Sequence, residues 1–247
     1  GEKFPTMAVQ IPGSINTVLL PTNAHLAAQE QNSMIKNLYI QSCRFINIFV
    51  GCMTGFLGPF SLAILSAWLG TDSKFYPAVW IMMIFSLAYQ LNDLTGPVSA
   101  YFRSHNRPQV ELAFGVVQII LSLLLTLIAV QYFDKTFSAI NWGVASGMII
   151  SSLGYLWYGD KDMKIPFILS LRRVFIPGLI PWLFGFALFF LSSSFMPHDT
   201  STRKEWIYFL IPVFLIYTIV TGTCMYFFIL DPNERTFLHN FVKRKTR

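Results

Sequence analysis

Residues 38–107 read LYIQSCRFINIFVGCMTGFLGPFSLAILSAWLG (38–70), TDSKFYP (71–77) and AVWIMMIFSLAYQLNDLTGPVSAYFRSHNR (78–107). A helix rises about 1.5 Å per residue, so about 20 residues cross the roughly 30 Å hydrocarbon core of a bilayer. Both long segments exceed that length, neither alternates apolar with polar residues, and both are too long for strands of a soluble protein. This stretch therefore predicts two membrane-spanning helices joined by a short polar turn.

The composition of the whole chain agrees with membrane embedding. Apolar residues make up 54% of the chain and charged residues only 12%, against about 25% charged residues in soluble domains. A soluble protein of 247 residues could not cover its surface with so few charges, whereas a helix bundle facing lipid has no such need. The fold predicted is all-α, an integral membrane helix bundle.

Hydropathy predicts seven membrane-spanning helices in a single transmembrane lobe. They lie at about 7–28, 38–69, 77–102, 110–133, 137–157, 175–196 and 206–230. Pro12, Gly13 and Pro21 interrupt the first of them, which indicates a helix that faces protein or water on one side. The segment 159–173 is too charged to span and is predicted to lie amphipathically on the membrane surface.

Basic residues divide unequally between the two sides that seven spans imply. One side receives 13 of the 18: Lys36, Arg44, Arg103, Arg107, Lys161, Lys164, Arg172, Arg173, Arg235, Lys243, Arg244, Lys245 and Arg247. The other receives Lys3, Lys74, Lys135, Arg203 and Lys204. Because cytoplasmic loops are enriched in Lys and Arg, we expect the first residue outside and the C-terminal tail in the cytoplasm. The net charge of +6 then reflects topology and contact with anionic lipid, not nucleic acid.

The sequence contains no pattern typical of an enzyme. The histidines are scattered, and no metal cluster, Gly-rich phosphate loop or nucleophile–base pair lies at a useful spacing. The cysteines Cys43, Cys52 and Cys224 lie inside apolar runs, and their odd number argues against a disulfide framework or a zinc site. We therefore expect no catalysis, no metal and no cofactor, which leaves a transporter or another membrane protein that binds a ligand.

Asp93 is the clearest candidate for function. It lies ten residues before Arg103, and ionisable groups inside a span are costly and mark functional sites by default. Asp93 can accept a proton, pair with a cation, or bind sugar hydroxyls together with Gln90 and Asn92. A structural interpretation stays open beside this one, in which Asp93 pairs with a neighbouring helix and sets the packing.

Three further polar residues are candidates for substrate binding. Arg44 lies early in its span, where its guanidinium can form bidentate hydrogen bonds with the oxygens of an anionic diphosphate. The alternative for Arg44 is to extend to the membrane interface with no further role. Asn23 and His25 lie in the interrupted first span and either line a cavity or serve as packed, hydrogen-bonded groups.

Several segments resemble the second lobe of polysaccharide flippases, of the O-antigen type, in the multidrug, oligosaccharidyl-lipid and polysaccharide exporter superfamily. The similarity is carried by VLLPTNAHLAA (18–28), LYIQSCRFINIFVG (38–51), ILSAWLG (64–70), FYPAVWIMMIFSLAYQLND (75–93) and VSAYFRSHNRPQVELAFGVVQIILSLLLTLI (98–128). It covers roughly residues 1–160. The turn YFRSHNRPQ (101–109) is bulkier and more basic than is usual in the family. Arg44 stands where the family often has a basic residue, and Asp93 has no clear counterpart.

The resemblance implies a bundle of 12 to 14 helices in two lobes that rock around a central cavity. Such a transporter moves an oligosaccharide linked to a polyprenyl diphosphate from the cytoplasmic to the outer leaflet of the plasma (inner) membrane. This chain would supply the last seven helices, and its first lobe would be a missing partner without which we expect no transport. Membrane lipid is the other partner expected.

Other functions fit the same pattern. A cation-coupled multidrug exporter of the same superfamily would use a deep acid, and Asp93 is the only deep acid that the predicted spans contain. A seven-helix membrane receptor fits the number of spans, although the loops are short and the cysteines are badly placed for a loop disulfide. A structural subunit of a larger membrane complex also stays open.

Overall fold

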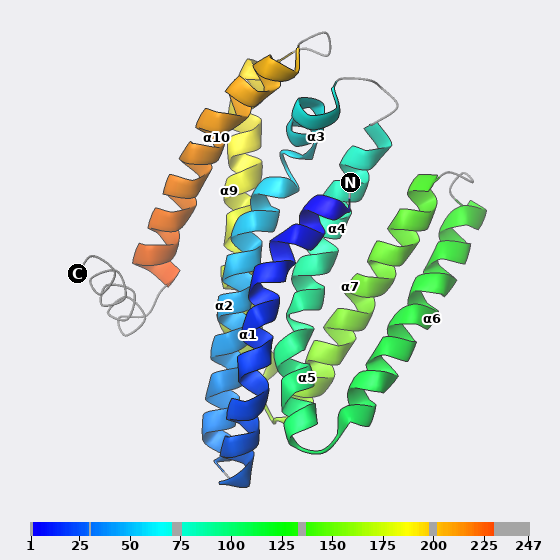
Figure 1. Cartoon of the computed structure of the whole chain (residues 1–247), viewed down its shortest axis with the longest axis vertical. Helices are drawn as coiled ribbons and strands as arrows, with labels where there is room; N and C mark the ends of the chain where they lie inside the picture. Colours follow the sequence, from blue (N-terminus) through cyan, green and yellow to red (C-terminus); the bar gives the residue numbers. More distant parts are fainter. Residues whose placement is uncertain (1, 30, 71–75, 133–136, 198–201, 230–247) are drawn as a thin grey trace.

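The computed structural model of the chain describes residues 2–29, 31–70, 76–132, 137–197 and 202–229. All secondary structure in these ranges is helical, and they contain no strand, which confirms the all-α prediction. The long helices run up and down beside one another as an elongated bundle (Figure 1). The end of the bundle at the bottom of Figure 1 is called the lower end, and the end at the top is called the upper end.

The helical elements follow the predicted segments in order. They are α1 (Lys3–Ala28), α2 (Asn32–Leu57), α3 (Ser61–Leu69), α4 (Tyr76–Asp93), α5 (Thr95–Ser104), α6 (Pro108–Tyr132), α7 (Phe137–Asp162), α8 (Phe167–Ser170), the π-helical turn η2 (Leu171–Phe175), α9 (Ile176–Ser192), the 3-10 turn η3 (Ser193–Phe195), α10 (Arg203–Cys224) and the π-helical turn η4 (Met225–Ile229). Two of the predicted segments, 38–69 and 77–102, are each divided into two helices.

Prolines explain where these two segments break. Between α2 and α3 the chain passes through Pro59, and α5 carries Pro97 in its first turn. Proline has no N–H to donate, so the backbone carbonyl four residues earlier, that of Asp93 in the second case, loses its helical partner. The Thr95 hydroxyl donates to the neighbouring Asn92 carbonyl oxygen at 2.7 Å.

Two elements differ from the sequence-based expectation. The first segment is one continuous helix, α1, despite Pro12 and Pro21, because it packs along α2, α4 and α5. The charged segment 159–173 is not a separate surface element: α7 continues to Asp162, and α8, η2 and α9 form one continuous helical path. Buried Met163 and Ile165 anchor the connection between the two helices.

Four of the described helices are long and apolar enough to cross a membrane by length and composition. They are Ser33–Leu57, Pro108–Tyr132, Phe167–Phe195 and Arg203–Phe227. Large apolar side chains on these helices are exposed, among them Leu123 (60%), Leu183 (69%) and Ile219 (66%). Such exposure suits hydrocarbon and not water. The chain is thus an α-helical membrane protein.

Glycines bring two pairs of helices into backbone contact. In the first pair, Gly51 and Gly55 of α2 face Gly178 and Gly185 of α9, and a Cβ on Gly55 would lie 2.8 Å from the carbonyl carbon of Pro181. In the second pair, Gly143 and Gly147 of α7 lie against the backbone of Thr126 and Ser122 in α6. Small residues four apart allow this close approach in lipid, where packing drives helix association.

The main apolar core lies between α2, α4, α5 and α7, on the lower side of the glycine contacts. Its fully buried members include Ile46 and Val50 of α2, Val98 and Phe102 of α5, and Leu156 of α7. This core holds the half-helix α5 against the bundle below the break. The end of α4 and its polar residues are therefore fixed in position.

We expect Gly185→Leu to lower the free energy of unfolding by about 3 kcal/mol, because a side chain there would meet the Gly55 carbonyl group and force α2 and α9 apart. The matched control is Gly222→Leu on α10, where a Cβ meets nothing within 4 Å. That variant should keep or slightly raise stability, since glycine is unfavourable inside a helix. Unfolding in mixed micelles, followed by tryptophan fluorescence, measures both. Equal stabilities would contradict the proposed role of the glycine contact.

Candidate functional site

A buried polar network is centred on Gln90, near the C-terminal end of α4. Its Nε2 donates to Asn47 Oδ1 on α2 at 2.7 Å and to the Gly178 carbonyl oxygen on α9 at 2.9 Å. Its Oε1 accepts from the Thr54 hydroxyl at 2.8 Å and from the Trp182 indole N–H at 2.7 Å. Both donors and the acceptor of the Gln90 amide are therefore in use, and the residue is 1% exposed.

The backbone of α9 takes part in this network because the glycines bring it close. Asn47 Nδ2 donates to the Val174 carbonyl oxygen at 2.8 Å, next to the start of α9. A Cβ on Gly178 would collide with the Asn47 amide. Gln90 and Asn47 together thus join α2, α4 and α9 inside the bundle.

Asn92 faces a different pair of helices. Its Oδ1 accepts from Gln118 Nε2 of α6 at 3.0 Å and from the Ser152 hydroxyl of α7 at 3.3 Å. Successive helical residues point about 100° apart, so Gln90 and Asn92 contact different neighbours although they are two positions apart. The side chains of Gln90 and Asn92, which were predicted to act together, thus contact different helices.

Asp93 lies at the break between α4 and α5. One oxygen of its carboxylate is buried and has no hydrogen-bond partner among the residues that the structure describes. The side chain as a whole is half-buried. A carboxylate in this state differs from Gln90 and Asn92, whose side-chain bonds are made within the fold.

The three remaining predicted residues lie on α1 and α2. Arg44 is half-buried on α2, one turn before Asn47. Asn23 is 3% exposed on α1, and its Oδ1 has no hydrogen-bond partner in the described part of the chain. His25 is exposed, and its Nε2 lies 3.1 Å from Gln29 Nε2.

Charged residues at the lower end are tied together across helices. The Tyr39 hydroxyl of α2 donates to buried Asp160 of α7 at 2.9 Å. Asp162 accepts from the Tyr101 hydroxyl at 2.9 Å and pairs with Arg107 at 2.9 Å. This carboxylate holds the pKa of the Arg107 guanidinium above its usual range through a hydrogen bond and its charge. These contacts fix α2, α5 and α7 relative to one another.

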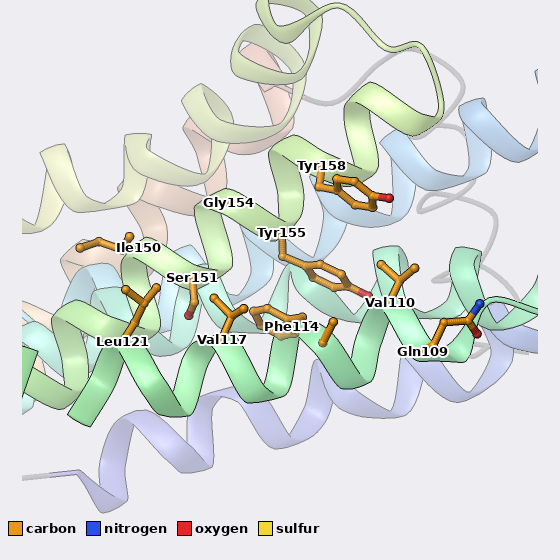
Figure 2. Close-up of a pocket in the computed structure, with 11 residues that line it drawn as sticks. Gln109, Val110, Phe114, Val117, Leu121, Ile150, Ser151, Gly154, Tyr155 and Tyr158 are labelled. Carbon is orange, nitrogen blue, oxygen red and sulfur yellow. The ribbon is translucent and has the colours of Figure 1, made fainter. Parts of the chain in front are cut away.

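An apolar groove runs between the lower parts of α6 and α7, and it is called the α6–α7 groove below (Figure 2). Its volume is about 560 Å³. It is lined by Gln109, Val110, Ala113, Phe114, Val117, Leu121, Ile150, Ser151, Gly154, Tyr155 and Tyr158. The rings of Phe114 and Tyr155 stack across it with centroids 4.2 Å apart.

Sequence reasoning missed the partners of Gln90. Asn47 and Thr54 were not singled out, although they lie seven residues apart on the helix face that also carries Gly51. A polar and small-residue stripe at that spacing signals a face packed against other helices. Nothing in the sequence indicated that Trp182 would meet it.

The described residues contain no group of three or more His, Cys, Asp or Glu side chains able to hold a metal ion. Cys43, Cys52 and Cys224 are unpaired thiols. The chemistry that this arrangement can offer is polar binding and charge pairing inside a membrane bundle. No protein-family model, curated protein or solved structure matches the chain.

We expect Gln90→Leu to lower the free energy of unfolding by about 2 kcal/mol, because it leaves the buried Trp182 indole N–H and Asn47 Oδ1 without their partner. Gln131→Leu, at an exposed position of α6, is the control and should change stability little. Chemical unfolding in micelles measures both. If Gln90→Leu leaves stability unchanged, the amide does not hold the three helices together.

Proposed function

We propose that the chain is one lobe of a membrane transporter of the polysaccharide flippase type. Its cargo is an oligosaccharide on a polyprenyl diphosphate, moved from the cytoplasmic to the outer leaflet. The sequence similarity over residues 18–128 suggests the class. The structural observation that carries the proposal is the interruption at Leu94, a single residue with helical backbone angles between α4 and α5, with Asp93 beside it inside a helical membrane protein. Membrane helices interrupted near proline or glycine, with polar groups at the interruption, point to transporter binding sites.

The cargo explains why such a break is useful. Sugars and a diphosphate cannot cross hydrocarbon unaided, so they need a wet and partly cationic path while the polyprenyl tail stays in lipid. Asp93 would bind sugar hydroxyls, and Arg44 would contact the diphosphate. A second lobe would complete the cavity, and rocking of the two lobes would open it to either side.

The proposed orientation places the lower end of the bundle in the cytoplasm. Basic residues gather at that end in the described ranges, namely Lys36, Arg103, Arg107, Lys161, Lys164, Arg172 and Arg173, whereas Arg203 and Lys204 lie at the upper end. The plasma membrane is the compartment expected, with all seven segments crossing it. The three segments beyond the four most apolar helices are α1, α4–α5 and α7. They are less apolar because they pack against other helices and carry polar residues.

A second candidate is a cation-coupled multidrug exporter. It is favoured by one observation, the buried carboxylate oxygen of Asp93 that has no partner among the described residues. A proton or a sodium ion would satisfy that oxygen. The two candidates predict different effects of substitution at this position.

Arg44→Ala tests the flippase proposal in proteoliposomes. The protein that is reconstituted includes any further residues that its gene encodes before or after this chain. Loss of a charge-assisted contact worth about 1.5–3 kcal/mol should slow translocation of lipid-linked oligosaccharide about tenfold or more. Accessibility of the glycan to an impermeant lectin measures the rate. Lys204→Ala, at the opposite end, is the control and should leave it unchanged. An unchanged rate in Arg44→Ala rejects the diphosphate contact, and no translocation by the unmodified protein rejects the flippase.

Asp93→Asn separates the two candidates in the same vesicles. Asparagine keeps the hydrogen-bonding shape but can neither take up a proton nor attract a cation. A flippase that uses Asp93 for sugar hydroxyls should keep measurable translocation that is independent of an ion gradient. A cation-coupled exporter should lose all gradient-driven transport of a fluorescent drug.

Accessibility of single cysteines tests the orientation. In a chain whose three natural cysteines are replaced by alanine, we expect Lys164→Cys to react with an impermeant maleimide only from the cytoplasmic side. Arg203→Cys should react only from outside, since both positions are exposed at opposite ends of the bundle. Reaction of both positions from the same side would contradict the proposed topology.

A further inference from the structure

Helix α6 lies at the edge of the bundle and is apolar almost all round. Of its described residues, only Ala129 is buried, while Leu112 is 71% and Leu127 is 67% exposed. It packs mainly against α7 and touches α5 near its start (Figure 1). In a membrane protein, the surroundings of such a helix are lipid chains. This point depends on membrane embedding and not on transport.

The two helices touch closely at one end and separate at the other. In the upper half, Gly143 and Gly147 of α7 lie against the backbone of Thr126 and Ser122. Below Ser122, the α6–α7 groove opens, and a Cβ on Gly154 would meet nothing within 4 Å. The close contact above thus marks one end of the slot. Toward the other end, Phe114 of α6 and Tyr155 and Tyr158 of α7 lie between the two helices (Figure 2).

The slot has the length of one lipid chain in one leaflet. From Val110 to Leu121 the α6 wall rises by eleven residue steps, or about 16 Å at 1.5 Å per residue. Half of the roughly 30 Å hydrocarbon core is about 15 Å. The volume of about 560 Å³ lies inside the range of about 300–1,000 Å³ that small-molecule sites occupy.

Polar and charged groups stand at the open end of the slot. Gln109 and Tyr158 line it there, and Arg107 Nη2 donates to the Tyr158 hydroxyl at 3.4 Å. One helical turn beyond Tyr158, exposed Lys161 lies over the Trp157 ring at 5.3 Å. The slot is therefore apolar inside, and at its mouth stand hydrogen-bond donors, the Arg107–Asp162 ion pair and exposed Lys161.

We infer that the α6–α7 groove is a binding site for a membrane phospholipid with an anionic headgroup. One acyl chain lies in the slot along Val117 and Leu121 and over the stacked rings of Phe114 and Tyr155, and the phosphate lies near Gln109, Tyr158 and Lys161. An anionic headgroup is favoured over a zwitterionic one, because exposed Lys161 adds a positive charge beside the Arg107–Asp162 pair and anionic lipids attract basic residues next to a span. The glycine at 154 leaves room for the chain to lie against the α7 backbone.

Photo-crosslinking of the full chain in phosphatidylcholine nanodiscs tests the inference. The probe is a phosphatidylglycerol whose acyl chain carries a diazirine, and peptide mass spectrometry locates the label. We expect label concentrated on Val117, Leu121 and Ile150, over the outward-facing Leu123 and Leu127. Gly154→Leu should fill the slot and reduce groove labelling at least about fivefold. Gly115→Leu is the matched control, since Gly115 also has open space but lies outside the groove, and it should leave labelling unchanged.

Other results would overturn the inference. Labelling spread evenly around α6 would show ordinary solvation by lipid, and this comparison needs no variant. Equal groove labelling by a diazirine phosphatidylcholine would reject the anionic headgroup. Groove labelling that survives Gly154→Leu would place the chain elsewhere. Translocation of an oligosaccharide is not measured here, so a failure of the proposed transport leaves this site untouched.

Discussion

Backbone contact between α2 and α9 is the constraint on which the centre of the bundle depends. Gly51 and Gly55 meet Gly178 and Gly185, so the carbonyl groups of one helix come within reach of side chains on another. Gln90 uses this proximity by donating to the Gly178 carbonyl oxygen. In lipid there is no hydrophobic force between helices, so packing and such hydrogen bonds must hold them. Larger residues in place of these glycines would remove both the close packing of α2 and α9 and the hydrogen bond from Gln90.

The helical fold and the order of the helices could be predicted from hydropathy alone, because each apolar run is longer than a soluble strand and close to the thickness of a bilayer. The positions where α2 gives way to α3, at Pro59, and where α4 gives way to α5, at Leu94, were harder to predict. Proline marks a possible interruption, yet α1 continues through Pro12 and Pro21. Whether a helix breaks at proline depends on neighbours that compensate for the lost bond, and the sequence does not name those neighbours.

The partners of the candidate site residues could not be predicted from the sequence, for a geometric reason. Gln90, Asn92 and Asp93 are adjacent in sequence and were expected to act together, but a helix turns them toward different partners. Gln90 meets α2 and α9, whereas Asn92 meets α6 and α7. Likewise, Asp160 was assigned to a surface segment and is in fact buried beneath Tyr39. Pairing across helices cannot be deduced from one sequence.

Hydrogen-bonding capacity separates polar residues that hold this bundle together from those available to a ligand. The donors and the acceptor of the Gln90 amide all form hydrogen bonds inside the fold. Binding of cargo by Gln90 would therefore require breaking its bonds to Asn47 or Trp182. Asp93 has a buried oxygen without a partner among the described residues, and it stands where α4 ends. An unsatisfied buried acceptor costs about 1–3 kcal/mol, more when charged. Asp93 keeps this cost in the described part of the chain, and in this it differs from Gln90.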